Sequence, residues 1–352
     1  PNFPREYELN INIADGQTLT NLVVTDLIPD NMQFLGVSST NPAATCGTQP
    51  STTTPDGTLE CTFATATGSA AAVDAQVVFE FYIPLLDVNG QPVLDPGTGD
   101  DAPSENQAGA VGDWDPLDPR DPPTVAASEE TTGGLPEHIL EDQSQAIQKS
   151  VRNVTDSNNS PGDVLEYTLE MQISDYFAFE DLFVYDTFSD GQRFDNSYAP
   201  TLGVSGNGFN LAAAAMAAAN VAVACNYTGG PGPECDSDNP AANDGTTLVT
   251  FELSAELLTR GRPDGQLLGG CVPVGGGTDY DCDPFDDGAT TATLVFRTII
   301  QDDFSDDFPS GDPSVDQGDE LTNDVLFDGA VLDNSNLTAT GEREDDDSAA
   351  SV

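Results

Sequence analysis

The sequence predicts an all-β protein that consists of two tandem β-sandwich domains. Residues 163–173 and 181–187 alternate apolar with polar side chains and are rich in β-branched and aromatic types, which is typical of half-buried antiparallel strands. Similar segments recur at short spacing with turn residues between them, as in a sandwich. The chain has 352 residues, of which 38% are hydrophobic, and this is enough for two packed cores.

An internal repeat supports the prediction of two domains. The segment that begins near residue 5 recurs from about residue 165, and each later match lies farther apart along the chain. Separations that grow in steps indicate fixed strands with longer loops inserted between them in the second copy. The matched pairs are Tyr7 with Tyr167, Asp26 with Asp186, Phe34 with Phe194, Phe63 with Phe251, and Asn106 with Asn323.

The repeat sets the domain boundaries. We expect domain one at residues 1–128, a linker at 129–142 and domain two at 143–352, with insertions in domain two at about 195–244 and 252–293.

Two further segments carry structural expectations. The alanine-rich run at residues 211–219 predicts a short helix capped by Asn210. The acidic tail at residues 344–352 is expected to lead into a further domain or to lie against one.

The charge of the chain restricts its partners. The net charge is −52, from 61 acidic and 9 basic residues, and it argues against nucleic acid and anionic lipid, which are themselves negative. Such acidity is typical of a salt-adapted protein or of an extracellular surface that collects calcium. No signal peptide or membrane span is recognisable, so we expect a mature or excised section of an exported protein.

The six cysteines predict disulfides. They occur in close pairs without Cys-x-x-Cys spacing, and the single histidine, His138, is far from every pair in the sequence, so a zinc site is not expected. An even number of cysteines in short loops indicates an oxidising, extracellular compartment. The expected pairs are Cys46 with Cys61, Cys225 with Cys235, and Cys271 with Cys282.

Lys149 is the only lysine in the chain. It precedes the alternating segment at 163–173 and is itself expected on a strand. One lysine among 61 acidic residues contributes nothing to solubility, which suggests that this position needs an amine.

Several features of domain two resemble a known family. Lys149 in a first strand, the turn at residues 161–163 before Tyr167, the run at 184–187, and Asn323 opening a last strand resemble the isopeptide-forming, immunoglobulin-like repeat domain of bacterial and archaeal surface proteins. Relatives of that family occur in pilin and adhesin stalks. The resemblance covers most of domain two outside its insertions, and residues 7–106 of domain one, and it implies immunoglobulin-like sandwiches for both.

The resemblance implies a spontaneous amide bond between Lys149 and Asn323. Burial would favour the neutral amine, which is a competent nucleophile. A carboxyl kept protonated by the same burial would polarise the carboxamide and transfer protons as ammonia leaves, and Asp186 is the candidate. The alternative is that Lys149 forms an ion pair with one of the many acids, while Asn323 makes a turn or a backbone hydrogen bond.

Domain one has counterparts of two of these residues, Asp26 and Asn106. Residues 1–7 match residues 161–167, so the sequence lacks the strand that would carry the lysine. Either residues before Pro1 supply that strand, or another subunit donates it by strand addition.

Two aspartate clusters have the spacing of calcium loops, although neither follows the EF-hand pattern. Calcium is the only cofactor that the sequence indicates. The clusters are Asp113, Asp115, Asp118 and Asp121, and Asp279, Asp281, Asp283 and Asp286.

Enzymatic function is not expected. A Ser-His-Asp triad would have to use His138, in the expected linker. We therefore predict a structural module of an extracellular stalk or filament, stabilised by disulfides and the isopeptide bond and assembled with further copies or domains of the same protein. The alternative is an adhesin that binds a ligand through the insertions of domain two.

Overall fold

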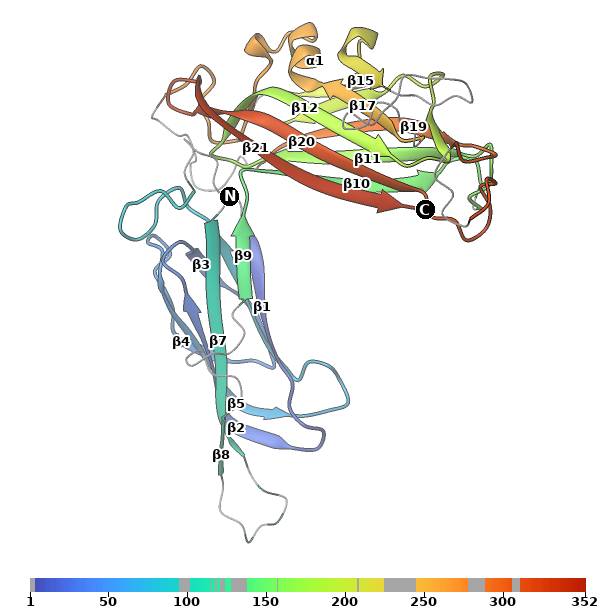
Figure 1. Ribbon diagram of the computed structural model, residues 1–352. Coiled ribbons are helices and arrows are strands. Elements are labelled where there is room, and N and C mark those ends of the chain that lie inside the picture. The colour runs from blue at the N-terminus through green and yellow to red at the C-terminus, as the bar shows by residue number, and fades with distance from the viewer. Residues whose placement is uncertain are drawn as a thin grey trace. The chain divides into compact units, whose positions relative to one another are not determined.

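The computed structural model describes residues 4–94, 102–114, 116, 118, 120, 124–127, 138–156, 158–207, 209–224, 245–277, 289–305 and 311–352. These residues separate into two compact units, one ending at Asp142 and the other beginning at Gln143. Strands dominate both units (Figure 1), so the prediction of an all-β fold is confirmed.

The first unit contains two antiparallel sheets. One has the order β1-β6-β3, and the other has the order β4-β5-β2-β7-β8, with β9 also paired to β7. The strands are β1 (Arg5–Ile11), β2 (Thr18–Ile28), β3 (Gln33–Asn41), β4 (Thr45–Thr48), β5 (Gly57–Thr67), β6 (Ala75–Tyr82), β7 (Ala102–Trp114), β8 (Thr124–Ala127) and β9 (His138–Asp142).

The second unit also contains two antiparallel sheets. One has the order β10-β11-β19-β14-β15 with β13 on β19, and the other has the order β16-β17-β12-β20-β21 with β18 on β12. Its strands are β10 (Gln145–Asn153), β11 (Val164–Ile173), β12 (Ala178–Phe188), β13 (Gln192–Phe194), β14 (Thr201–Ser205), β15 (Leu211–Ala215), β16 (Val221–Ala224), β17 (Thr247–Glu252), β18 (Leu267–Leu268), β19 (Thr290–Ile300), β20 (Thr322–Asp333) and β21 (Thr338–Ser351).

Alternating burial fixes the register of the strands. In β12 and β20 every second side chain is buried along most of the strand, and a shift of one residue would turn these apolar side chains outward. Each fully buried Phe or Leu contributes roughly 1.5–3 kcal/mol. The first unit buries Phe34, Phe63 and Phe79, and the second buries Phe251 and Phe296.

The internal repeat is visible in the strand ladders. Tyr7 pairs with Phe79 and stacks on it, with ring centroids 5.5 Å apart. Tyr167 pairs with Phe296 in the same way, at 5.2 Å. Strand β1 therefore corresponds to β11, and β6 corresponds to β19.

One predicted alignment is wrong by two positions. In the ladders, Cys61 faces Val24 and Phe251 faces Val184, so Phe251 corresponds to Cys61 and not to Phe63. The shift is even, so it keeps the same residues on the buried face, and for that reason the sequence pattern did not reveal it.

The alanine-rich run does not form the predicted helix. Residues Leu211–Ala215 form strand β15, which pairs with β14, and only Ala218–Asn220 form a 3-10 turn, η1. The helix of the insertions is α1 (Leu253–Thr259). It ends at Thr259, with Arg260 as its C-cap. The next residue, Gly261, has a φ of 90°, and the last carbonyls of the helix accept from Gly261 N and Arg262 N, a Schellman end that suits glycine.

Two further segments differ from expectation. Residues His138–Asp142 form β9 and pair with β7, so they are not linker. Strand β19 begins at Thr290, close to the expected end of the second insertion at about residue 293. The acidic tail forms β21 and pairs with β20 along most of its length (Figure 1). Pairing with neighbouring strands places these segments in the sheets, although their polar composition alone indicated loops.

Candidate functional site

Lys149 and Asp186 form a buried ion pair across the second unit. Lys149 lies on β10 and Asp186 on β12, which belong to different sheets. The two side chains are fully buried, and Lys149 Nζ lies 2.5 Å from Asp186 Oδ2. The amine also lies 5.3 Å from the centre of the Tyr167 ring. The prediction that Lys149 occupies a strand is confirmed.

Asn323 is the neighbour of this pair. In the β12–β20 ladder Asp186 faces Val325 and Phe188 faces Asn323. Asn323 therefore lies diagonally opposite Asp186 on the same face of the sheet. It is fully buried, and within the described residues neither polar atom of its carboxamide has a hydrogen-bond partner. A buried carboxamide without partners is costly, which marks this position as unusual.

Burial shifts the pKa values of Lys149 and Asp186 in the directions that favour their uncharged forms. It raises the pKa of Asp186 to about 6, although the Lys149 ammonium and the Asn323 carboxamide oppose this rise. It lowers the pKa of Lys149, against the attraction of Asp186. The influence of Asn323 on Asp186 reflects its proximity, because no atom pair between them has hydrogen-bond geometry. Proton transfer from the Lys149 ammonium to the Asp186 carboxylate would give the neutral forms that acyl transfer requires.

The first unit contains the same carboxyl and carboxamide. Asp26 on β2 is fully buried and Asn106 on β7 is 3% exposed. Asn106 Nδ2 donates a hydrogen bond of 2.8 Å to Asp26 Oδ2. Burial raises the pKa of Asp26 to about 7. Asp26 Oδ1 and Asn106 Oδ1 have no partner within the described residues.

A groove of about 890 Å³ lies beside this pair. Its walls come from β1, β7 and β9 and include Tyr7, Asn106, Ala108, His138 and Leu140. The Tyr7 hydroxyl hydrogen-bonds His138 Nδ1, and burial raises the pKa of Tyr7 to about 12. We did not predict a role for His138, because its sequence neighbourhood indicated a linker and Tyr7 is far from it in the sequence.

Two of the predicted disulfide cysteines are joined within the described residues. Cys46 and Cys61 form a disulfide between β4 and β5. Cys271 is also disulfide-bonded. Cys225, Cys235 and Cys282 lie outside them as well.

Most of the predicted calcium ligands lie outside the described residues, namely Asp115, Asp121, Asp279, Asp281, Asp283 and Asp286. Asp113 accepts a hydrogen bond from Asn21, and Asp118 pairs with Arg120. Within the part of the chain that is described, no group of three or more His, Cys, Asp or Glu side chains is arranged to hold a metal.

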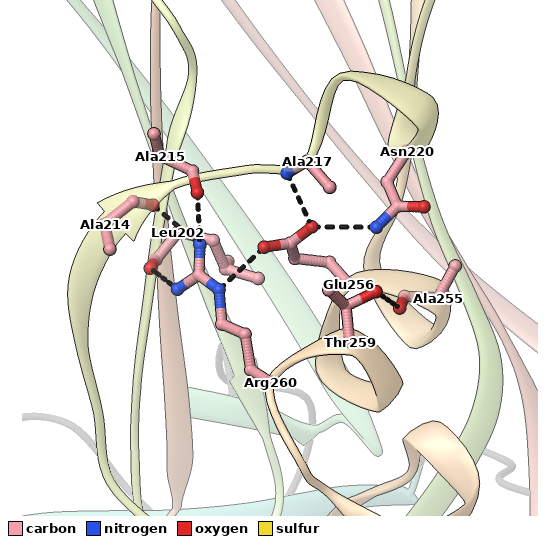
Figure 2. Close-up of polar contacts among 9 residues, drawn as sticks. All are labelled: Leu202, Ala214, Ala215, Ala217, Asn220, Ala255, Glu256, Thr259 and Arg260. Atoms are coloured by element: carbon pink, nitrogen blue, oxygen red, sulfur yellow. Dashed lines mark hydrogen bonds and ion pairs between the residues drawn. The ribbon is translucent and has the colours of Figure 1, made fainter.

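A polar cluster that the sequence analysis missed organises the insertions of domain two (Figure 2). Glu256 of α1 is 1% exposed and accepts hydrogen bonds from Ala217 N, Asn220 Nδ2 and Arg260 Nε. Arg260 in turn donates to backbone oxygens of β14 and β15. The spacing of Glu256 and Arg260, one helical turn, was the available signal.

This cluster is structural. It fastens the alanine-rich strand to α1, and every polar group of Glu256 and Arg260 that Figure 2 draws points at a protein partner. We therefore do not assign it a binding function.

The helices of the described residues are all too short or too polar to cross a membrane.

Comparisons with known proteins identify structural neighbours. No family model matches the chain, and no curated protein matches it. Among solved structures it is similar to the T6 backbone pilin of serotype M6 Streptococcus pyogenes, at 11% identity and a TM-score of 0.27, covering 99% of this chain and 64% of the pilin.

Two further structures are similar at comparable levels. The full-length major pilin SpaD from Corynebacterium diphtheriae matches at 10% identity and a TM-score of 0.26, covering 96% of this chain and 65% of that one. The collagen-binding domain from a Staphylococcus aureus adhesin matches at 11% identity and a TM-score of 0.26, covering 58% and 97%. The chain thus spans about two thirds of the length of these pilins. Pilin backbones and collagen-binding adhesin domains are its structural neighbours.

Proposed function

We propose that the chain is a structural module of an extracellular stalk or filament, in which an isopeptide bond joins Lys149 to Asn323. The observation that carries this proposal is the buried group of an amine, a carboxyl and a carboxamide with unpartnered polar atoms. A purely structural ion pair explains the first two groups. It gives no reason to bury Asn323 without hydrogen bonds beside them.

The reaction needs no external reagent. The neutral amine of Lys149 attacks Cγ of Asn323, so that a Nζ–Cγ bond forms and the Cγ–Nδ2 bond breaks. Protonated Asp186 polarises the carbonyl and passes a proton from Nζ to the departing nitrogen, which leaves as ammonia. Oxidation states do not change. The surrounding apolar core excludes water, which would otherwise compete as a nucleophile.

Such a bond would suit a molecule under tension. Lys149 belongs to one sheet of the second unit and Asn323 to the other, so the amide would tie the sheets together. The closed loop would run from Lys149 to Asn323 and enclose most of the second unit. By the chain-entropy estimate for cross-links, a loop of this length disfavours the unfolded state by about 5 kcal/mol.

Assembly would involve further copies or domains of the same protein. In the first unit β1 pairs only with β6 among the described strands, and a free strand edge of this kind tends to be filled by strand addition. An extracellular location follows from this function and agrees with the disulfide of the first unit.

Peptide mapping tests the proposed bond directly. After digestion and reduction of the folded chain, a branched peptide that links β10 to β20 through Lys149 and Asn323 is expected in the mass spectrum. Separate linear peptides carrying unmodified Lys149 and Asn323 would refute it.

The second candidate function is an adhesin that uses the insertions as a binding surface. The buried Glu256–Arg260 pair favours it, because it fastens strands β14 and β15 to α1, and a recognition surface gains affinity from such preorganisation. Deleting both insertions separates the two functions. A stalk module would still fold and assemble, whereas an adhesin would lose its target.

A further inference from the structure

The turn that joins β20 to β21 carries the tripeptide Asn-Leu-Thr at residues 336–338. The pattern Asn-x-Ser/Thr is the acceptor for N-linked glycosylation, in which a sugar is joined to the side-chain nitrogen of the asparagine. Three more tripeptides of the chain fit this pattern, and they begin at Asn153, Asn158 and Asn226. Since so short a pattern also arises by chance, exposure and hydrogen bonding have to distinguish an acceptor site from a coincidence.

The middle residue of the tripeptide anchors the turn. Leu337 is partly buried against a small apolar cluster, whereas its neighbours Asn336 and Thr338 are exposed. The cluster consists of Ala178, Leu268, Val272 and Leu332. Leu337 has a φ of 56°, in the left-handed region that bulky residues rarely occupy. The packing of Leu337 therefore fixes a turn that presents the other two side chains to solvent.

The carboxamide of Asn336 and the hydroxyl of Thr338 interact directly. Asn336 Oδ1 accepts hydrogen bonds from Thr338 Oγ1 and, at 2.9 Å, from Thr338 N. An amide nitrogen is a poor nucleophile, because its lone pair is delocalised into the carbonyl. A donor at Oδ1 stabilises negative charge on that oxygen, so the Nδ2 proton is removed more easily and the nitrogen becomes able to attack. The geometry thus gives the threonine a chemical role two positions after the asparagine.

The side-chain nitrogen of Asn336 is also accessible. Nδ2 donates to Asp333 Oδ2 at 3.2 Å and to Ser335 Oγ at 3.4 Å, which is longer than the usual distance of about 2.9–3.0 Å. Both contacts are exposed, so an incoming group replaces them at low cost. The nitrogen can therefore meet a reagent that approaches from solvent.

Asn153, at the end of β10, has the same pattern and a different geometry. Its Nδ2 donates to Asn158 O at 2.7 Å and to Asp163 Oδ2 at 2.9 Å. The hydroxyl of the following threonine, Thr155, accepts a hydrogen bond from Val164 N. The Asn153 side chain thus holds the turn between β10 and β11 together, and its nitrogen is already engaged.

Asn158 is exposed but lacks the geometry of the Asn336 turn. Ser160 N, which would have to donate to the Asn158 carboxamide in such a turn, donates to Asp163 Oδ2 at 3.0 Å. Ser160 also precedes Pro161, which restricts it to extended conformations. Asn226 lies outside the described residues. Among the asparagines that the structure describes, Asn336 combines exposure with a hydroxyl on its carboxamide.

We propose that Asn336 is the acceptor of an N-linked glycan, transferred by a cellular glycosyltransferase from a sugar activated as a phosphate or diphosphate ester. Asn336 Nδ2 attacks C1 of the sugar, the Nδ2–C1 bond forms, and the C1–O bond to phosphate breaks. The phosphate leaves with the bonding electrons, one Nδ2 proton is released, and no oxidation state changes overall. This modification goes beyond the proposed function and does not depend on the bond between Lys149 and Asn323.

Mass spectrometry of the full chain, recovered from the surface of the cells that produce it, tests the proposal. The reduced protein is digested, and the peptides that carry Asn336, Asn153 and Asn158 are each fragmented. We expect the Asn336 peptide to carry added mass that is lost as sugar residues on fragmentation. The Asn153 and Asn158 peptides are expected at their sequence masses.

Matched variants made in the same cells identify the chemistry. Asn336→Asp keeps the side-chain oxygen that accepts from Thr338 N but removes the nucleophile, so it should lose the whole glycan. Thr338→Val keeps the β-branched shape but removes the hydroxyl and should also lose it, whereas Thr338→Ser should retain it. Asn158→Gln changes an exposed asparagine without this geometry and should leave the glycan unchanged. Circular dichroism checks that each variant is folded.

The outcomes decide the proposal. A glycan on Asn336 that disappears in Thr338→Val and persists in Thr338→Ser would support it. An Asn336 peptide found only at its sequence mass would overturn it, as would a glycan that persists in Thr338→Val. Because every variant is compared with the wild type, the ammonia lost in the Lys149–Asn323 bond is common to all of them and does not affect the comparison.

Discussion

Lys149 Nζ and Asp186 Oδ2 lie 2.5 Å apart, although their strands belong to opposite sheets of the second unit. A contact of this kind is expensive to form, since both charges lose their hydration. The only lysine of the sequence takes part in it. We propose that this desolvation cost is tolerated because the neutral forms of Lys149 and Asp186 react with Asn323 to form the amide bond.

Removing the lysine should destabilise the second unit alone. We expect Lys149→Met to lower its free energy of unfolding by about 5 kcal/mol or more, because a cross-link of the unfolded chain is lost and a buried carboxyl also loses its partner. Urea denaturation followed by circular dichroism measures this loss. Trp114 fluorescence, which reports on the first unit, should show an unchanged transition. A shift in both transitions would contradict the assignment.

The first unit should lose stability as pH rises through the range between the two pKa values of Asp26. Its folded pKa is raised from 3.8 to about 7 by burial, so the folded state holds a proton that the unfolded state has already released above about pH 4. Stability from this group therefore falls between about pH 4 and 7. Other ionisable side chains that line the groove include Glu6, Tyr7 and His138.

The variant Asp26→Asn isolates this effect, because it leaves those other groups in place. The stability of the variant relative to wild type should rise with pH by up to about 4 kcal/mol across this window. Urea titrations monitored through Trp114 at several pH values give the comparison. A pH-independent difference between the two proteins would show that Asp26 is ionised in the fold.

The Glu256–Arg260 pair should hold strand β15 in place. We expect Arg260→Met to cost about 3–5 kcal/mol, since it leaves Glu256 buried and unpaired, and to speed amide exchange in Leu211–Ala215. The matched control is Arg152→Met. Arg152 also pairs with a glutamate but is 72% exposed, and such surface pairs contribute about 0–1 kcal/mol. Equal effects of both variants would contradict this role.

Calcium should raise thermal stability if the acidic clusters bind it, because a bound cation relieves repulsion among their carboxylates and stabilises the folded state by linkage. Millimolar calcium is compared with chelator in the wild type and in a variant with Asp279→Asn and Asp281→Asn. We expect the gain in wild type only. Identical melting temperatures in chelator and in calcium would contradict calcium binding by these clusters.

The sequence predicted those parts of the structure that depend on local pattern. Alternation identified the strand that carries Asp186 and the strand that follows Lys149, and the family resemblance placed Asn323 on a strand. The repeat identified Asp26 and Asn106 as the counterparts of Asp186 and Asn323 before any contact was known. Prediction from the sequence failed where pairing between strands overrides the helix propensity of a segment. The alanines at 211–215 prefer a helix on their own, but β14 and the Arg260 side chain supply partners for their backbone.

Contacts distant in sequence were also beyond the pattern. His138 meets Tyr7 only because β9 pairs with β7, and the polar composition of that segment indicated a linker. The shift between Cys61 and Phe63 could not be detected, since both residues face the core. Alternation of period two shows which face of the sheet a residue occupies. It does not show which of two residues on the same face is the counterpart in the other domain.

The central claim is the amide between Lys149 and Asn323, and intact mass of the folded, fully reduced chain tests it most directly. The account predicts a mass lower than the sequence mass by one ammonia, and restoration of the full mass in Lys149→Arg, Asn323→Ala and Asp186→Ala. Lys149→Arg is the sharpest of these variants because it retains the positive charge beside Asp186. A wild-type mass equal to the sequence mass, in protein shown by circular dichroism to be folded, would contradict the account and leave Lys149 as the partner of a buried ion pair.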